Sequence, residues 1–121
     1  MEIEKVNLKA KLNMFSDYWS PKIVGELNNQ TLKVAKFKGE FMMHHHEKED
    51  ELFYVITGEL FIELKDKTLH LHAGEFVIIP KGVAHKPYAP KEVHVLLFEP
   101  ATTLNTGNVT NHQTVSDLDK I

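Results

Sequence analysis

Residues 39–58 read GEFMMHHHEKEDELFYVITG, with three consecutive histidines and an acidic run between two apolar segments. In an extended strand alternate side chains share a face, so His44 and His46 point to one side and His45 to the other. A charged run follows, and an apolar strand pattern resumes after Glu51. If two adjacent strands bring Glu51 beside the two imidazoles, these three side chains can bind one metal ion.

A second segment, residues 74–85, reads GEFVIIPKGVAH and ends on another histidine. Pro80 and Gly82 predict a turn after an apolar strand, and His85 opens the segment that follows. Three His and one Glu would leave one or two coordination positions for water or substrate, as a catalytic metal requires. These ligands suit one divalent transition metal, Fe, Mn, Zn, Ni or Cu, without choosing among them. Each residue alone equally fits a solvated strand end, so the prediction rests on their joint spacing.

The joint spacing resembles the two motifs of the cupin superfamily. The matching positions are Gly39, His44, His46, Glu51 and Gly58 in the first motif, and Gly74, Pro80, Gly82 and His85 in the second. The resemblance covers about residues 30–100. It implies an all-β fold, a small antiparallel double-stranded β-helix (a jelly-roll or cupin barrel), with one metal inside. The implied metal ligands are His44, His46, Glu51 and His85.

Two positions depart from the family pattern. Gly39 precedes the first histidine by one residue fewer than usual, which concerns only a turn. Ala89 stands where the family often has an Asn. The family's substrate orientation near His85 therefore cannot be carried over to this chain. Small single-domain cupins are often likened to mannose-6-phosphate isomerase, so that analogy implies a sugar isomerase as one version of the activity.

Length and composition exclude several classes of protein. A chain of 121 residues with 42% hydrophobic and 26% charged residues suits one globular domain. It has no apolar run long enough to span a membrane and no apolar N-terminal signal, so we expect a cytoplasmic protein with no membrane partner. The net charge of −3, with dispersed cations, argues against nucleic acid. All 14 cations are Lys, so an anionic substrate would lack the bidentate clamp of Arg.

The rest of the pattern predicts a short N-terminal helix followed by strands. Leu8, Leu12 and Phe15 share a helical face with Asn7 as the N-cap, and Ser20-Pro21 would end that helix. Seven strands are expected at Thr31–Phe37, Phe41–His46, Leu52–Thr57, Leu60–Lys65, Thr68–His72, Glu75–Ile79 and Val93–Glu99, with a turn at Pro87–Pro90. We divide the chain into an N-terminal helix and arm (1–30), a barrel (31–100) and a tail (101–121), all in one domain.

The strand that begins at Glu51 is apolar on both faces, with Phe53 and Val55 on the inward face of Glu51. Something must cover its outer face, either a second sheet or a partner subunit, so we expect a homodimer. The aromatic residues of the N-terminal arm, among them Trp19, would provide that cover or close one end of their own barrel. Both interpretations fit the sequence.

Four residues are candidate substrate contacts. Lys36 shares a strand face with apolar neighbours and is either a snorkelling strand-end residue or a pocket amine that binds an anion. Met42 shares the face of His44, and Phe53 shares the face of Glu51. Tyr88 is a candidate pocket wall. His70 and His72 alternate with leucines and are expected on a solvent-facing strand.

Three classes of function fit this pattern. The first is a metalloenzyme that acts on a small polar molecule, in a sugar isomerase-like or a dioxygenase-like reaction. The second is a non-catalytic module that binds a metal or a small ligand. The third is a structural barrel with an incidental histidine cluster. An open metal position beside a cavity would favour the enzyme.

Overall fold

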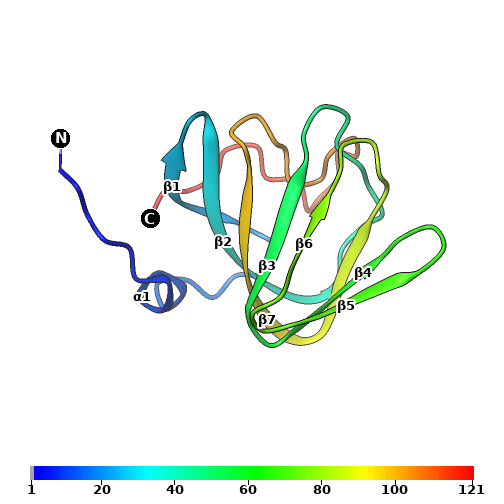
Figure 1. Cartoon of the computed structure of the whole chain (residues 1–121), viewed down its shortest axis with the longest axis horizontal. Coiled ribbons are helices and arrows are strands. Elements are labelled where there is room, and N and C mark those ends of the chain that lie inside the picture. The colour runs from blue at the N-terminus through cyan, green and yellow to red at the C-terminus, as the bar shows by residue number, and fades with distance from the viewer. Residues whose placement is uncertain (1) are drawn as a thin grey trace.

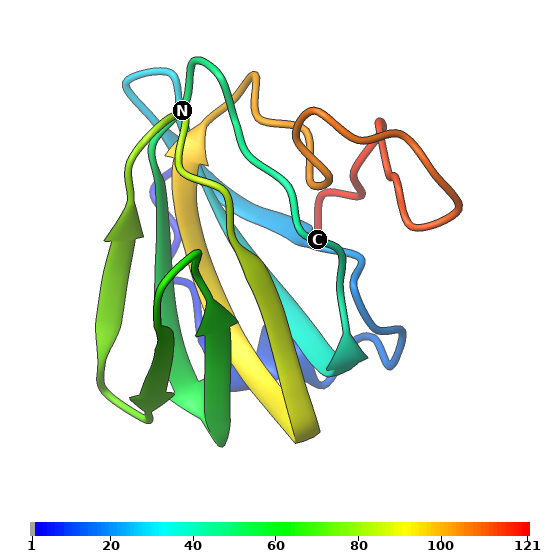
Figure 2. The same cartoon turned by 90° about the vertical axis from the view of Figure 1, so that its right-hand side faces the viewer.

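The computed structural model describes residues 2–121 and shows an all-β barrel with one short helix (Figures 1 and 2). In chain order the elements are α1 (Leu8–Leu12), β1 (Lys22–Leu27), β2 (Gln30–Glu40), β3 (Glu51–Thr57), β4 (Glu59–Glu63), β5 (Thr68–His72), β6 (Phe76–Ile79) and β7 (Lys86–Pro100). The strands pair antiparallel. This confirms the predicted jelly-roll fold.

The long strand β7 joins the two halves of the barrel. All seven strands belong to one sheet, in which five follow the order β1-β2-β7-β3-β6, while β4 pairs with both β5 and the start of β7. The register brings Phe61 opposite Tyr88 at one end of β7, and Leu52 opposite Phe98 near the other. The β4–β5 hairpin projects on one side of the barrel, and α1 with the preceding residues extends from the opposite side (Figure 1).

Three sequence-based boundaries were wrong. The expected strand at residues 41–46 makes only an isolated bridge between His44 and His85. The expected turn at Pro87–Pro90 lies inside β7, because the Pro87 carbonyl accepts a hydrogen bond from Phe41 and a register shift near Gly39 accommodates the second proline. Strand β1 was missed because Gly25, at a register shift, interrupts its pattern.

The predicted N-terminal helix forms but is shorter than expected. Asn7 caps it as predicted, since its side chain accepts a hydrogen bond from the backbone N–H of Ala10 at 3.0 Å. The helix ends at Leu12, its one buried residue, rather than at Ser20-Pro21. Phe15 therefore lies beyond the helix, where its ring contacts the ammonium of Lys36.

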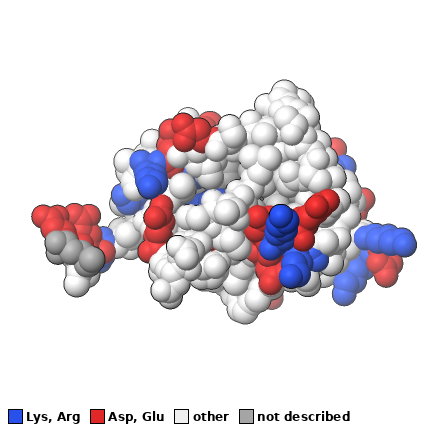
Figure 3. Space-filling model, turned by 90° about the horizontal axis from the view of Figure 1, so that it is seen from above, with Lys and Arg blue, Asp and Glu red and all other residues white. Residues whose placement is uncertain are grey.

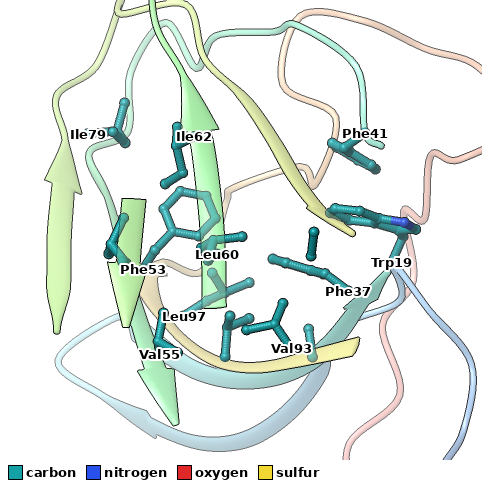
Figure 4. Close-up of a cluster of buried hydrophobic side chains, with 14 residues drawn as sticks. Trp19, Phe37, Phe41, Phe53, Val55, Leu60, Ile62, Ile79, Val93 and Leu97 are labelled. Atoms are coloured by element: carbon teal, nitrogen blue, oxygen red, sulfur yellow. The ribbon is translucent and has the colours of Figure 1, made fainter. Parts of the chain in front are cut away.

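The barrel interior is filled by inward-facing side chains of β2, β3, β4 and β7 (Figure 4). Trp19, from the N-terminal arm, closes one end of this core. Its ring stacks on Phe37 and Phe41, with centroid separations of 4.2 and 4.8 Å, and its indole N–H donates to the Lys38 carbonyl. Of the two interpretations of the arm, the structure supports the one in which Trp19 closes its own barrel.

The outer face of β3 and β6 stays apolar and incompletely covered. Leu52 and Tyr54 are half-buried, and their cross-strand partners Ile78 and Phe76 are exposed. On the face seen in Figure 3, lysine and acidic side chains lie beside one another. Within residues 2–121 no helix is both long and apolar enough to cross a membrane.

Residues 101–121 form turns that lie along the loop after β2 (Figure 2). Asn108 makes two hydrogen bonds with His45: its side chain accepts from the His45 N–H at 2.9 Å, and its own N–H donates to the His45 carbonyl at 3.0 Å. Gly107, at φ +56°, packs against the same backbone. The C-terminal segment therefore holds the histidine-rich loop from outside.

Candidate metal centre

Four side chains converge inside the barrel, and they are the four predicted metal ligands. Reciprocal backbone hydrogen bonds of 3.0 and 2.8 Å pair His44 with His85. Glu51 is the first residue of β3 and points inward with Phe53 and Val55, as predicted. The Gly82 N–H donates to the His46 carbonyl at 2.7 Å and so fixes this part of the loop to the turn before His85.

The geometry of the cluster suits a single ion. Glu51 Oε1 lies 3.2 Å from His85 Nε2 and 3.3 Å from His46 Nε2. One nitrogen or oxygen from each of the four residues lies within 4.8 Å of the others, and all four residues are buried. Ligand atoms that each lie about 2.0–2.2 Å from one ion would be separated from one another by distances similar to those between these four side chains. His45 points away, toward Glu47, as strand alternation predicted.

Backbone carbonyls orient two of the histidines. The Nδ1 atoms of His44 and His85 lie 3.0 Å from the Met42 carbonyl and 2.9 Å from the Val83 carbonyl. A carbonyl accepts only, so each Nδ1 must carry the proton, and each Nε2 then presents a lone pair. This outer contact is the usual way in which a metal-binding His is oriented.

The electrostatics of the site favour ligands ready to bind a cation. Burial, with His85 next to it, lowers the pKa of His44 to about 4, so its imidazole is neutral at neutral pH. Burial alone would raise the pKa of Glu51, but the imidazoles of His46 and His85 beside the carboxylate outweigh burial and hold that pKa well below its usual range. A neutral imidazole and an ionised carboxylate are the protonation states that a metal requires.

His46 provides an independent test of whether a metal fits. Both of its ring nitrogens are buried and have no hydrogen-bond partner among residues 2–121, although Glu51 Oε1 lies 3.3 Å from Nε2. A buried polar atom without a partner costs about 1–3 kcal/mol. A metal ion bound by His46 would satisfy one of these nitrogens. The donor set and the unpartnered ring therefore both fit a divalent transition metal.

A narrow pocket adjoins the cluster: about 20 Å³ of it is open to a water-sized molecule, and its total empty volume, which includes open solvent at its mouth, is about 360 Å³. Its walls are mostly apolar, and four of the lining residues are the aromatic Trp19, Phe37, Phe41 and Phe53. His44 and Glu51 also line it, so the metal site faces the pocket. This arrangement matches an open site beside a cavity better than a metal enclosed by protein on all sides.

The structure places the four predicted substrate contacts in different surroundings. Phe53 lines the pocket. Met42 packs against the edge of the core, and its carbonyl orients His44. Tyr88 stacks on Phe61, away from the pocket residues. Lys36 lies on the outer face of β2, where its ammonium donates to the Phe15 carbonyl, so the structure does not bring it to the cluster.

Sequence reasoning missed a buried ion pair inside the barrel. Lys33 of β2 and Glu99 of β7 point inward, with their side chains 3% and 2% exposed, and Lys33 Nζ lies 2.7 Å from Glu99 Oε1. Burial, together with the charge of Glu51, raises the pKa of Glu99 well above its usual range. The signal that could have identified Lys33 is strand alternation, since Lys33 lies on the same face of β2 as the core residues Ala35 and Phe37.

Comparisons with known proteins agree with this geometry. The family model described as "Cupin domain" matches residues 31–99. The crystal structure of a cupin-2 domain containing protein from Shewanella frigidimarina superposes with a TM-score of 0.78 at 41% identity, covering 78% of this chain and 93% of that one. The uncharacterized protein YdbB of Bacillus subtilis is 41% identical over 81 residues, which cover 66% of this chain and 72% of YdbB.

An enzyme is also among the relatives. The 3-hydroxyanthranilate 3,4-dioxygenase of Xenopus laevis is 29% identical over 101 residues. The alignment covers 78% of this chain but only 36% of the dioxygenase. This chain therefore matches about a third of that enzyme's length.

Proposed function

The chain belongs to the cupin family, and from that premise we propose that it is a metal-dependent dioxygenase that acts on a small aromatic molecule carrying hydroxyl or amino groups. The observation that carries this proposal is the buried cluster of three His and one Glu that opens onto a pocket with aromatic walls. The similarity to 3-hydroxyanthranilate 3,4-dioxygenase supports the same reaction class.

The pocket favours an aromatic substrate over a sugar. Sugar recognition needs many hydrogen-bonding side chains, whereas Trp19, Phe37 and Phe41 present ring faces and edges. A sugar phosphate would also need a cationic clamp, and Lys36 lies outside the barrel. The pocket thus supports the dioxygenase version of the proposal and not the isomerase version. It also favours an enzyme over a non-catalytic module, because two of the four ligands line it.

The residues of the chain have distinct roles in this proposal. His44, His46, Glu51 and His85 would hold the ion, with His44 and His85 oriented by carbonyls. A divalent metal in this place supplies Lewis acidity and, in the case of iron, one-electron chemistry. Trp19 and Phe41 exclude water from one end of the pocket. The Phe53 ring packs edge-on against the His85 ring, with 6.0 Å between the ring centroids.

We also propose that the enzyme is a homodimer, joined through the outer face of β3 and β6. Ile78 and Phe76 are 53% and 61% exposed and lie beside the half-buried Leu52 and Tyr54. Apolar side chains grouped on one sheet face are typical of an interface between subunits. The uncharged, apolar character of this face supports a second copy of the chain as its cover.

Oxygen uptake tests the proposed reaction. The protein is loaded anaerobically with Fe(II), mixed with catechol, 2-aminophenol or hydroquinone, and followed with an oxygen electrode. We expect at least one compound to consume dioxygen stoichiometrically. The matched variants are His45→Ala, which should retain activity, and His46→Ala, which should lose it. Uptake no faster than that of the metal-free protein with all three compounds would refute the proposed reaction.

A further inference from the structure

A second group of side chains suited to binding a metal lies on the outer face of the β4–β5 hairpin, outside the barrel core. His70 and His72 share the exposed face of β5, as the sequence predicted, while Leu71 between them is buried in the core. In the antiparallel register Glu59 lies directly opposite His72, and Phe61 lies opposite His70. Glu59 and the two histidines are therefore neighbours on one face of the sheet.

The Glu59 carboxylate faces both imidazoles at once. Its Oε1 lies 3.1 Å from His70 Nε2 and 3.1 Å from His72 Nε2, and the centroids of the two rings are 4.3 Å apart. Ligand atoms that each lie about 2.0–2.2 Å from one ion are about 3 to 3.5 Å from their neighbours in octahedral or tetrahedral geometry. The spacing on the hairpin is therefore that of three ligands of a single ion.

Glu75 orients the His72 ring. Its Oε1 accepts a hydrogen bond from the backbone N–H of His72 at 2.7 Å and lies 3.5 Å from His72 Nδ1. A carboxylate beside Nδ1 favours the tautomer that carries the proton on that nitrogen, so that Nε2 presents a lone pair on the side of Glu59. A carboxylate that contacts the outer nitrogen of a histidine is a common accompaniment of zinc sites.

The His70 ring is held by aromatic stacking that runs across three strands. It stacks on Phe61 of β4 with a centroid separation of 4.2 Å, and Phe61 stacks in turn on Tyr88 of β7 at 5.2 Å. This stack fixes the plane of an otherwise exposed side chain, so less conformational entropy is lost when the ring binds an ion. Ion pairs on a protein surface contribute little to stability, so pairing with Glu59 does not by itself account for the arrangement.

We infer that Glu59, His70 and His72 bind a zinc ion on the outer face of the β4–β5 hairpin, with water in the remaining coordination positions. Two imidazoles and one carboxylate are ligands that zinc accepts. Among the described strands β5 pairs with β4 alone, so an ion bound from both strands would clamp the hairpin closed. The inference is independent of the proposed function, because it involves none of the four ligands inside the barrel.

The two metal sites differ in how firmly they hold an ion. The hairpin ligands are exposed to water, and their side chains are between 40% and 58% exposed, whereas the four ligands of the barrel cluster are buried. Water weakens the attraction between an ion and its ligands. We therefore expect desalting to remove zinc from the hairpin and to leave it in the barrel.

The test measures zinc binding to protein purified without a histidine tag. The protein is reconstituted with zinc and desalted, which fills the barrel cluster, and more zinc is then added in an isothermal titration calorimeter. The variants are His72→Gln and Glu59→Gln, each of which removes one hairpin ligand. His94→Gln is the matched control, because His94 also forms a surface pair with a glutamate, Glu92, at 2.6 Å.

Wild type and His94→Gln should take up about one further equivalent of zinc. His72→Gln and Glu59→Gln should bind it at least about tenfold more weakly, since even the loss of a group that orients a ligand weakens metal binding about 10- to 100-fold. No further uptake by wild type would overturn the inference. Equal affinity in wild type and the two variants would also overturn it, because the ion would then be bound elsewhere.

Two further readouts locate the ion and test the clamp. Imidazole nitrogen spectra of wild type should show zinc-dependent shifts at the Nε2 atoms of His70 and His72, and unshifted Nε2 resonances would overturn the assignment. Zinc should slow hydrogen exchange of the β5 amides in wild type but not in His72→Gln, and unchanged exchange in wild type would overturn the clamp. If the barrel keeps no zinc through desalting, the barrel assignment fails, while the difference between wild type and His72→Gln still decides the hairpin site.

Discussion

Replacing Gly107 with Ala should loosen the histidine-rich loop from outside. A Cβ at this position would overlap the His45 carbonyl oxygen and lie 3.0 Å from the His44 ring. To relieve the overlap, the C-terminal segment must move away and lose its two hydrogen bonds between Asn108 and His45. Each such bond contributes about 0.5–1.5 kcal/mol. The left-handed backbone, at φ +56°, adds about 1–2 kcal/mol of strain for any residue with a Cβ.

Gly74→Ala is the matched control for this prediction. Gly74 has φ +87°, and no atom of the described residues lies within 4 Å of the position that a Cβ would take, so Ala there meets the backbone strain without the clash. In urea unfolding, Gly107→Ala should lose about 1–3 kcal/mol more than Gly74→Ala. Zinc titration should also show weaker binding in Gly107→Ala alone, because His44 and His46 flank His45, whose backbone loses its hydrogen bonds to Asn108. Equal losses of stability and unchanged zinc affinity in the two variants would refute the reasoning.

Three further predictions concern acid stability, the outer face and the barrel end. The folded pKa of His44, about 4, lies below its ordinary value of 6.5, so between these values the unfolded chain binds more protons and stability falls as pH falls. Urea unfolding of metal-free protein at pH 7 and pH 4 should show a loss of about 3 kcal/mol that His44→Gln lacks, and an equal loss in the variant would contradict this. Ile78→Asp should convert a dimer to a monomer in size-exclusion chromatography with light scattering, whereas a monomeric wild type would contradict the proposed interface. Trp19→Ala should cost about 3–5 kcal/mol in urea unfolding because it empties the stack on Phe37 and Phe41, and a loss below about 1 kcal/mol would show that the arm does not close the barrel.

The sequence predicted the metal cluster because the ligands follow local rules. Strand alternation separated His45 from its two neighbours, and the spacing of the two motifs brought in Glu51 and His85. The same rule succeeds even though residues 41–46 form no regular strand, because the chain there is extended enough to keep alternate side chains apart.

The pocket was harder to predict because it depends on register between distant strands. Lys36 was a substrate candidate and Lys33 was overlooked, yet β2 turns Lys33 inward with Ala35 and Lys36 outward. Both faces of β2 are apolar in places, so periodicity alone did not identify the inner one. Glu99 is similar, since it alternates in phase with the buried Val93, Val95 and Leu97, and its inward direction follows only once the inner face of β7 is known.

The role of the C-terminal segment also could not be predicted from the sequence. Residues 101–121 carry few apolar side chains and were expected to be a tail. Their position depends on hydrogen bonds of Asn108 to backbone more than sixty residues away and on the absence of a side chain at Gly107. Neither feature produces a periodic pattern.

Metal content measured on untagged protein tests the central claim most directly. Wild type, His46→Ala and His45→Ala are purified in parallel, reconstituted with one divalent metal, desalted and analysed by inductively coupled plasma mass spectrometry. Because His46 points into the cluster and His45 points toward Glu47, we expect about one equivalent in wild type and His45→Ala and little in His46→Ala. No bound metal in wild type, or equal loss in both variants, would contradict the assignment of the four ligands.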